Sequence, residues 1–337
     1  MLSIDYFAQR HRRRQRQFLC VISVLVLAMM YLYLASGEVW VSPFSVLHSQ
    51  NTTGLAETLL WEIRLPRLLS ALLVGASLAV SGACLQVLLG NALAEPGVLG
   101  ISGGASVLMV MVMLCFPQFN QPWALMMCAV LGALLFTLIL LGISRRYRMS
   151  TSRLLLVGVA LGILSSAGMT WGFYFSDQHS LRQLIYWLMG SLSGSSWSYL
   201  WVSLLMFPAL CWLLCQGHAL DQWTMGEQHA RQLGLATDRL RWRLIIAVAV
   251  LVGGAVAIAG IVSFVGLIVP HLVRLLCGAQ HRFVLLCSAL GGALLVGLSD
   301  LGARTLLESA ELPLGVVTTS LGAPVFIWML MKHYDHR

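Results

Sequence analysis

Residues 18–36 read FLCVISVLVLAMMYLYLAS, nineteen consecutive residues without a charged side chain. As a helix, such a run is long enough to cross the roughly 30 Å hydrocarbon core of a bilayer. Four arginines stand just before it, at positions 12, 13, 14 and 16. A secretory signal peptide would have an apolar region of only about 7–15 residues. The stretch therefore predicts a first transmembrane helix.

Nine further apolar stretches follow along the whole chain. Of its 337 residues, 58% are hydrophobic and 10% are charged, whereas soluble domains carry about 25% charged residues. A soluble fold is therefore excluded. We predict an all-α integral membrane protein of about ten transmembrane helices, built as a single domain over residues 1–337. The nine further spans are predicted at 68–89, 97–116, 123–143, 153–175, 197–214, 244–259, 262–276, 283–298 and 313–331.

The basic residues predict the orientation of these spans. If the N-terminus is cytoplasmic, 17 of the 21 lysines and arginines fall on the inner side, and only Arg64, Arg67, Arg182 and Arg304 face outward. Cytoplasmic segments of membrane proteins carry such an excess. Ten spans then place the C-terminus in the cytoplasm as well. The net charge of +8 reflects this topology, and no nucleic-acid partner is predicted.

Two residue counts limit the chemistry of the chain. Its only lysine is Lys332, so it cannot contain the Gly-x-x-x-x-Gly-Lys-Ser/Thr loop with which many ATPases hold phosphate. Its eight cysteines are scattered and include no Cys-x-x-Cys pair, which indicates neither a zinc site nor a disulfide framework. We expect no metal, no cofactor and no ATP hydrolysis by this chain alone.

The distribution of acidic residues argues against an ion-driven transporter. Such proteins bind the driving ion on ionisable groups deep in the membrane. Here the acidic residues near the spans are expected at their edges, at Glu95, Asp300, Glu308 and Glu311. The energy is therefore predicted to come from a partner. A distant alternative is an intramembrane serine protease, for which Ser102 and His271 are the nominal nucleophile and base.

Residues 215–242 form the longest inner loop and are a candidate docking segment. Thr224–Glu227 has the pattern of a capping box that starts a short helix, which Gly234 can end. Thr237 is a candidate cap for a following helix. Met225, His229 and Leu233 recur at i, i+4 spacing and share one face. Such an apolar stripe suits a groove on a soluble protein, although a helix lying on the bilayer surface would look similar.

Two stretches of the chain echo each other. Arg64-Leu-Pro-Arg67 precedes the small residues Gly75 and Gly82, and Arg239-Leu-Arg241 precedes Gly254 and Gly260. The two stretches enter the membrane from opposite sides in the predicted topology. This pattern is typical of inverted repeats, with five helices each over about residues 1–195 and 196–337.

Several of these motifs resemble the FecCD-type permeases, the membrane subunits of importers for iron-siderophores, haem and cobalamin. The similar segments are 64–67, 91–102 and 230–235. Three more stretches resemble the cobalamin-importing members in particular, at 150–162, 181–190 and 311–328. The substrate expected from the resemblance is thus vitamin B12 (cobalamin), with an iron-siderophore or haem as the alternative.

The resemblance also implies an assembly. The fold would be that of a type II ATP-binding-cassette (ABC) importer permease in the bacterial inner membrane. The chain would form a homodimer with two cytoplasmic ATPase subunits, and a periplasmic binding protein would deliver the substrate.

The resemblance implies roles for single residues as well. The arginines that pair with carboxylates of the binding protein would be Arg64, Arg67 and Arg304. The cytoplasmic gate would contain Asn91, Leu93, Ser150 and Thr151. The contact with the ATPase would contain Met225, His229, Ala230, Leu233 and Gly234. The family usually has proline where this chain has Ala92, which predicts a less rigid gate loop.

Overall fold

The computed structural model describes residues 2–37, 40–44, 54–119, 121–147, 151–307 and 310–334. Within these ranges the regular structure is entirely helical. The helices are α1 (Leu2–Ala35), α3 (Gly54–Thr58), η1 (Leu59–Arg64), α4 (Leu65–Leu88), α5 (Ile101–Cys115), η2 (Pro117–Phe119), α6 (Pro122–Arg146), α7 (Thr151–Phe175), α8 (Gln178–Leu188), α9 (Trp197–Ser203), α10 (Met206–Cys215), α11 (Gly217–Trp223), α12 (Glu227–Gln232), α13 (Thr237–Ala259), α14 (Val265–Cys277), α15 (His281–Thr305) and α16 (Leu314–Tyr334).

The lengths of the helices fit a membrane protein. Six helical segments are long and apolar enough to cross a bilayer: α1, the run 54–88 that ends with α4, α6, α7, α13 and α15. The pair α9 and α10 could form one more span, bent by 46°. Three shorter apolar helices, α5, α14 and α16, complete the set among the described residues. The all-helical membrane fold is therefore confirmed, while the count of ten spans stays a prediction.

Several details of the helices differ from those predicted. The span predicted at 197–214 is divided between α9 and α10, and α13 begins at Thr237 and not near residue 244. Helix α8 was not predicted, because eleven residues with a buried Leu184 and an exposed Tyr186 do not form a continuous apolar run. Thr237 does not cap a separate short helix, because it is already the first residue of α13.

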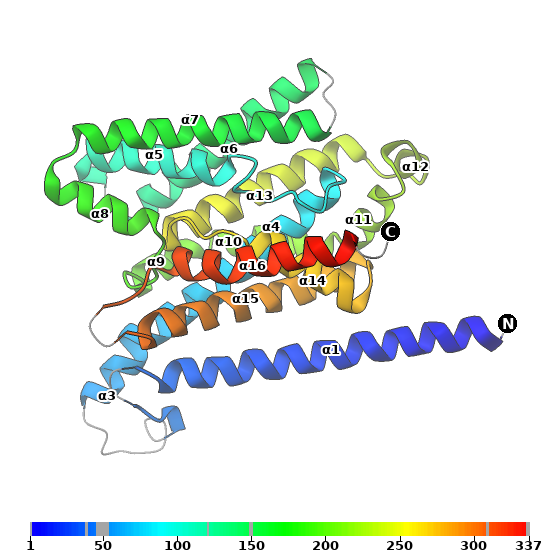
Figure 1. Ribbon diagram of the computed structural model, residues 1–337, viewed down its shortest axis with the longest axis horizontal. Coiled ribbons are helices and arrows are strands. Elements are labelled where there is room, and N and C mark those ends of the chain that lie inside the picture. Colours follow the sequence, from blue (N-terminus) through cyan, green and yellow to red (C-terminus); the bar gives the residue numbers. More distant parts are fainter. Residues whose placement is uncertain are drawn as a thin grey trace.

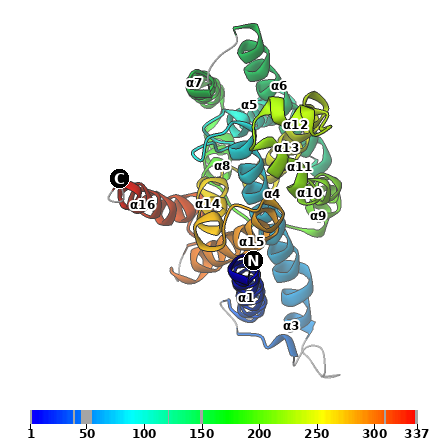
Figure 2. The ribbon, with the colours of Figure 1, turned by 90° about the vertical axis from the view of Figure 1, so that its right-hand side faces the viewer.

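Helix α4 forms the centre of the subunit. It packs against α13, α14 and α15, and 83% of the most apolar part of its span is buried, compared with 22% for α7. Figure 2 shows α4 surrounded by other helices, whereas α7 and α16 project from the same side of the molecule. The exposed apolar faces of α7 and α16 therefore remain available for lipid or for another subunit.

Glycines allow the central helices to pack with their backbones in contact. A Cβ atom on Gly75 would collide with the backbone of Gly292 in α15, and one on Gly82 would collide with the backbone of Gly266 in α14. Gly104 and Gly132 meet in the same way between α5 and α6. Small residues at helix crossings are the usual basis of tight packing in membranes, and here they bring α14 and α15 against the buried α4, and α5 against α6.

Helices α5 and α14 begin in a similar way. Each follows a residue in the left-handed backbone region: Gly100, with φ of 75°, precedes α5, and Phe264, with φ of 68°, precedes α14. Helix α14 packs on α4, and α5 packs on α13. Each of these two helices thus packs on a long helix from the other half of the chain, which is what two equivalent repeats would produce. The division into repeats at about residue 195 stays a prediction.

The two ends of the subunit carry different segments. Figure 1 shows the N-terminal end of α1, the C-terminal end of α16 and the short helix α12 at one end. Helices α3, α8 and α9 lie at the opposite end. The first group carries the basic segments predicted to be cytoplasmic, so we refer to the two ends as inner and outer.

Candidate functional site

Arg64 lies at the outer end of the subunit and caps helix α1. Its Nη1 donates hydrogen bonds to the carbonyl oxygens of Leu34 at 2.7 Å and Ala35 at 3.1 Å. These carbonyls lie at the C-terminal end of α1, where a helix lacks intrahelical donors and favours a cation. Gly37 leaves room for the guanidinium, because a Cβ there would lie 2.6 Å from Arg64 Nη2. Arg64 is 5% exposed.

Arg67, one helical turn further along the chain, binds two carboxylates. Its Nε and Nη2 donate to Asp300 at 2.9 and 3.0 Å, and its Nη1 and Nη2 donate to Glu311 at 2.9 and 3.0 Å. The side chain of Asp300 is 1% exposed, that of Arg67 is 8% exposed and that of Glu311 is 45% exposed. Paired forks of this kind are among the strongest side-chain hydrogen bonds. The hydrogen bonds from Arg67 lower the pKa of Glu311 below its ordinary value.

Arg304 joins the same cluster from α15. Its Nη2 donates to the carbonyl oxygen of Tyr33 at 2.9 Å, and its guanidinium lies 4.2 Å from the centre of the Tyr33 ring. The Tyr33 hydroxyl in turn donates to Asp300 at 2.5 Å. All three arginines predicted to dock the binding protein thus come together at the outer end, and each is bound within the chain. Their docking role stays a prediction.

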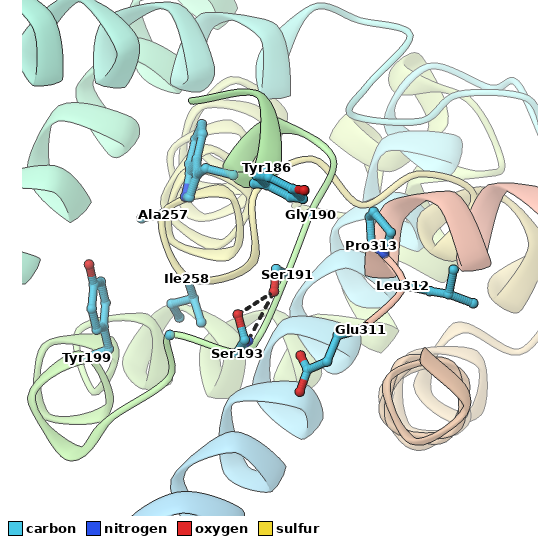
Figure 3. Close-up of a pocket in the computed structure, with 12 residues that line it drawn as sticks. Tyr186, Gly190, Ser191, Ser193, Tyr199, Ala257, Ile258, Glu311, Leu312 and Pro313 are labelled. Atoms are coloured by element: carbon cyan, nitrogen blue, oxygen red, sulfur yellow. Dashed lines mark hydrogen bonds between the residues drawn. The ribbon is translucent and has the colours of Figure 1, made fainter. Parts of the chain in front are cut away.

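A hollow of about 500 Å³ opens beside this cluster. Its walls come from the end of α8, the segment 190–194, α9, the end of α13 and the segment 311–313. Figure 3 shows Glu311 at its rim, across from Tyr199, with Ser191 and Ser193 hydrogen-bonded to each other between them. The hollow is lined by hydroxyl groups, aromatic rings and one carboxylate, which suits a polar or amphipathic guest. Sequence reasoning did not identify it.

The predicted gate loop follows α4 at the inner side. Gly90, with φ of 58°, ends α4 in a Schellman motif, in which the amides of Gly90 and Asn91 bond to the carbonyl oxygens of Val87 and Gln86. Asn91 Oδ1 accepts a hydrogen bond from the Leu93 amide at 2.8 Å. This turn orders the loop where the family usually has proline. Leu93 is 43% exposed.

The second half of the predicted gate is only partly described. The loop packs on α7, because a Cβ on Gly158 would lie 2.9 Å from the Leu99 backbone. Thr151 begins α7, but its side chain lies outside the described residues, as does Ser150. The gate role of Asn91, Leu93, Ser150 and Thr151 therefore stays a prediction.

Two of the acidic residues predicted at span edges lie there and are buried: Glu95 in the loop before α5, and Asp300 near the outer end of α15. Asp300 is the partner of Arg67, and Glu95 is 7% exposed. The Glu95 carboxylate accepts a hydrogen bond at 2.6 Å from the amide of Phe264, the strained residue before α14. Hydropathy could not predict that these two acidic side chains are buried, because the hydrogen-bond donors that make their burial possible come from distant parts of the sequence.

The predicted coupling segment is a short helix held firmly on the membrane part. Ala230 of α12 is fully buried. Arg231 donates to Glu227 at 2.9 Å, to Asp238 at 3.1 Å and to the Thr237 hydroxyl at 2.8 Å. These contacts tie α12 to the first turn of α13. Sequence reasoning missed them, although the i, i+4 spacing of Glu227 and Arg231 is a recognisable signal.

The ends of α12 confirm one prediction and correct another. Gly234, with φ of 87°, ends the helix as predicted. The capping box is wrong: Gly226 is the N-cap residue, and the Thr224 hydroxyl donates instead to the Asp221 carbonyl oxygen at 2.7 Å. Met225, His229 and Leu233 are all exposed, at the surface of the inner end. The predicted single helical face is wrong, because α12 is only six residues long: His229 lies within it, Met225 precedes its N-cap residue and Leu233 is its C-cap residue.

No group of histidine, cysteine or acidic side chains in the described ranges could hold a metal ion. The bundle and its glycine crossings define a helical membrane protein. A model of the FecCD transport family matches residues 24–332, and the chain belongs to this family.

Curated relatives cover nearly the whole chain. It is 57% identical over 328 residues to the vitamin B12 import system permease protein BtuC of Vibrio parahaemolyticus, with 97% of each chain covered. It is 58% identical to the protein of the same name from Vibrio cholerae, again with 97% of each covered. The protein of that name from Salmonella typhi is 49% identical, with 97% of this chain and 98% of the relative covered.

A solved structure supports the same fold. It is described as an inward-facing conformation of an ABC transporter assigned to the metal-chelate type. The two chains superpose with a TM-score of 0.84 at 31% sequence identity, over 94% of this chain and 99% of the other.

Proposed function

We propose that this chain is the membrane-spanning permease subunit of an ABC importer that carries vitamin B12 across the bacterial inner membrane. The observation that carries the proposal is the identity of 49–58% to relatives named vitamin B12 import permeases, over 96–98% of their lengths. The similarity covers 96–97% of this chain, so it extends over nearly the whole subunit and is not limited to one segment.

The proposed assembly contains two copies of the chain, two cytoplasmic ATPase subunits and a periplasmic binding protein. The apolar faces of α7 and α16, which project together from one side (Figure 2), support a second copy as a neighbour. The exposed side chains of Met225, His229 and Leu233 on and beside α12 support an ATPase contact, in which Ala230 is buried beneath the helix and Gly234 ends it. Closure of the ATPases on ATP would move α12 together with α13, since Arg231 joins them.

An iron-siderophore or haem is the second candidate substrate. The observation in its favour is the fold shared with a transporter assigned to the metal-chelate type, at 31% identity. The higher identity to vitamin B12 permeases favours cobalamin. The protease alternative has no such support, because Ser102 lies on α5 and His271 on α14, two helices that pack mainly on different neighbours.

Transport assays decide between the substrates. The permease, expressed with its ATPase in a strain that lacks its own cobalamin and siderophore permeases, should restore uptake of labelled cobalamin. It should not restore uptake of labelled ferric siderophores. A strain carrying the ATPase alone is the control. Uptake of a ferric siderophore without cobalamin uptake would contradict the proposed substrate but leave the family assignment intact.

A further inference from the structure

The donors of Arg67 are almost completely used within the subunit. A guanidinium has five N–H groups, and four of them are used in the bonds to Asp300 and Glu311. The two carboxylates differ in position. Asp300 is buried at the helix side of the fork, whereas Glu311 is 45% exposed and covers its outward side. A molecule approaching from the outer side therefore meets Glu311 before Arg67.

Asp300 is sufficient to keep Arg67 in place. It accepts two hydrogen bonds from Arg67 and one from the Tyr33 hydroxyl. If Glu311 left, the buried charge of Arg67 would still be paired, so the large cost of an isolated buried charge would not arise. Asp300 can thus hold Arg67 in place by itself, and Glu311 can be exchanged for another carboxylate.

Glu311 belongs to a segment that reaches the hollow. The Leu312 amide donates to the Ala303 carbonyl oxygen at 2.9 Å, and the Leu314 amide donates to the Gly190 carbonyl oxygen at 2.8 Å. Gly190 and Glu311 both line the hollow of about 500 Å³. In Figure 3 the Glu311 carboxylate stands at the rim of this space. Freeing it from Arg67 would therefore move a negative charge at the mouth of the hollow.

We propose that Glu311 is an internal placeholder on Arg67, and that a carboxylate of the docking protein takes its place. The inference rests on the proposed function, since it assumes a binding protein that docks at the outer end. The exchange replaces one charge-assisted fork by another, so Arg67 is paired before and after docking. It also couples docking to the hollow, because the displaced Glu311 is released at its rim.

Exchange predicts the direction of an affinity change. Glu311 competes with the incoming carboxylate, so only the fraction of molecules with a free outer fork binds at full strength, and the measured affinity is lowered by that fraction. Glu311→Gln weakens the internal competitor while keeping the shape of the side chain. Its affinity for the binding protein should rise about five- to tenfold. If Glu311 only held Arg67 in place for docking, the same variant would bind more weakly.

The experiment measures binding of the cobalamin-binding protein to the permease–ATPase complex in lipid nanodiscs. Glu62→Gln is the matched control, because Glu62 is an exposed acid at the same end and lies outside the cluster of Arg67, Asp300 and Glu311. It corrects for the loss of one negative charge from this surface. Binding to Glu311→Gln that is tighter than binding to Glu62→Gln supports the exchange. Equal or weaker binding overturns it.

A second variant separates this proposal from the proposed function. Arg67→Gln with Asp300→Asn removes the docking cation while keeping its buried partner neutral, and a melting curve reports whether it folds. If this variant binds poorly while Glu311→Gln is unchanged, Arg67 is a docking contact but the exchange is wrong. If the folded double variant binds as well as the wild type, Arg67 does not dock the partner. Absence of binding by the wild-type complex would overturn the proposed function itself.

Discussion

At the scale of single residues, the inner surface depends on how α12 is held. Ala230 faces the subunit with no exposed surface, and Arg231 binds three side chains around it. Met225, 65% exposed, precedes the N-cap residue of the helix, and Leu233, 59% exposed, is its C-cap residue. Two large apolar side chains exposed at the two ends of a helix that Arg231 ties to α13 are suited to a preformed groove.

Leu233→Asp should therefore uncouple the permease from its ATPase. The substitution places a charge in a contact that becomes apolar on association, at a cost of several kcal/mol if the site is fully buried. We expect pull-down of the ATPase to fall by tenfold or more, about 1.4 kcal/mol or greater. Membrane insertion should remain normal, since Leu233 is exposed in the isolated subunit.

Gln228→Asp is the matched control for this prediction. Gln228 is exposed on α12 and is not one of the residues proposed to contact the ATPase, and an acid near the N-terminal end of a helix is favourable. This variant should bind the ATPase as the wild type does. If Leu233→Asp also binds and transports normally, α12 is only a surface helix and the proposed contact is wrong.

At the scale of helices, the packing of α4 is set by two glycine pairs. Gly75 lies against Gly292 of α15, and Gly82 lies against Gly266 of α14. Each contact is between backbones, which cannot move aside as a flexible side chain can. Since α14 is also held by Glu95 at its start, its position depends on both the crossing and the loop before α5.

Gly82→Ala should destabilise the subunit. The added methyl group would meet the Gly266 backbone, and overpacking of this kind costs about 1–3 kcal/mol. Gly142→Ala in α6 is the control, because nothing lies within 4 Å of its added Cβ and alanine favours the helix. Thermal melting in detergent should show a lower midpoint for the first variant and an equal or higher one for the second. Equal midpoints would show that the α4–α14 crossing is not tight.

The sequence predicted the elements better than their contacts. The uncharged run at 18–36 was enough to place the membrane part of α1, and the span predicted at 153–175 coincides closely with α7. The bend between α9 and α10 was missed because hydropathy does not report helix direction. As predicted, Arg64, Arg67 and Arg304 lie at the end of the bundle away from the N-terminus of α1, but their burial was not foreseen. Asp300 lies 233 residues from Arg67 in the chain, and no local pattern connects them.

At the scale of the whole molecule, the remaining question is what drives transport. The buried acids revealed by the structure do not form a chain across the subunit. Asp300 is paired with Arg67 near the outer end, and Glu95 is bound to the Phe264 amide in the loop before α5. A proton relay needs acidic groups that exchange protons in sequence along a path. These two are held by separate partners on separate elements.

ATP hydrolysis by the partner should therefore be the only energy source. Proteoliposomes containing permease and ATPase should take up cobalamin, delivered by the binding protein, when ATP is present on the ATPase side. A protonophore should leave that uptake unchanged, because no group in the described part of the chain is arranged to use a proton gradient. The permease without its ATPase should neither hydrolyse ATP, since its only lysine is Lys332, nor accumulate cobalamin under an imposed pH gradient. Glu95→Gln keeps an oxygen that can accept the Phe264 amide while removing the titratable group, and it should retain ATP-driven uptake. Uptake that collapses with the protonophore, or that Glu95→Gln abolishes in a correctly folded complex, would show that a proton takes part.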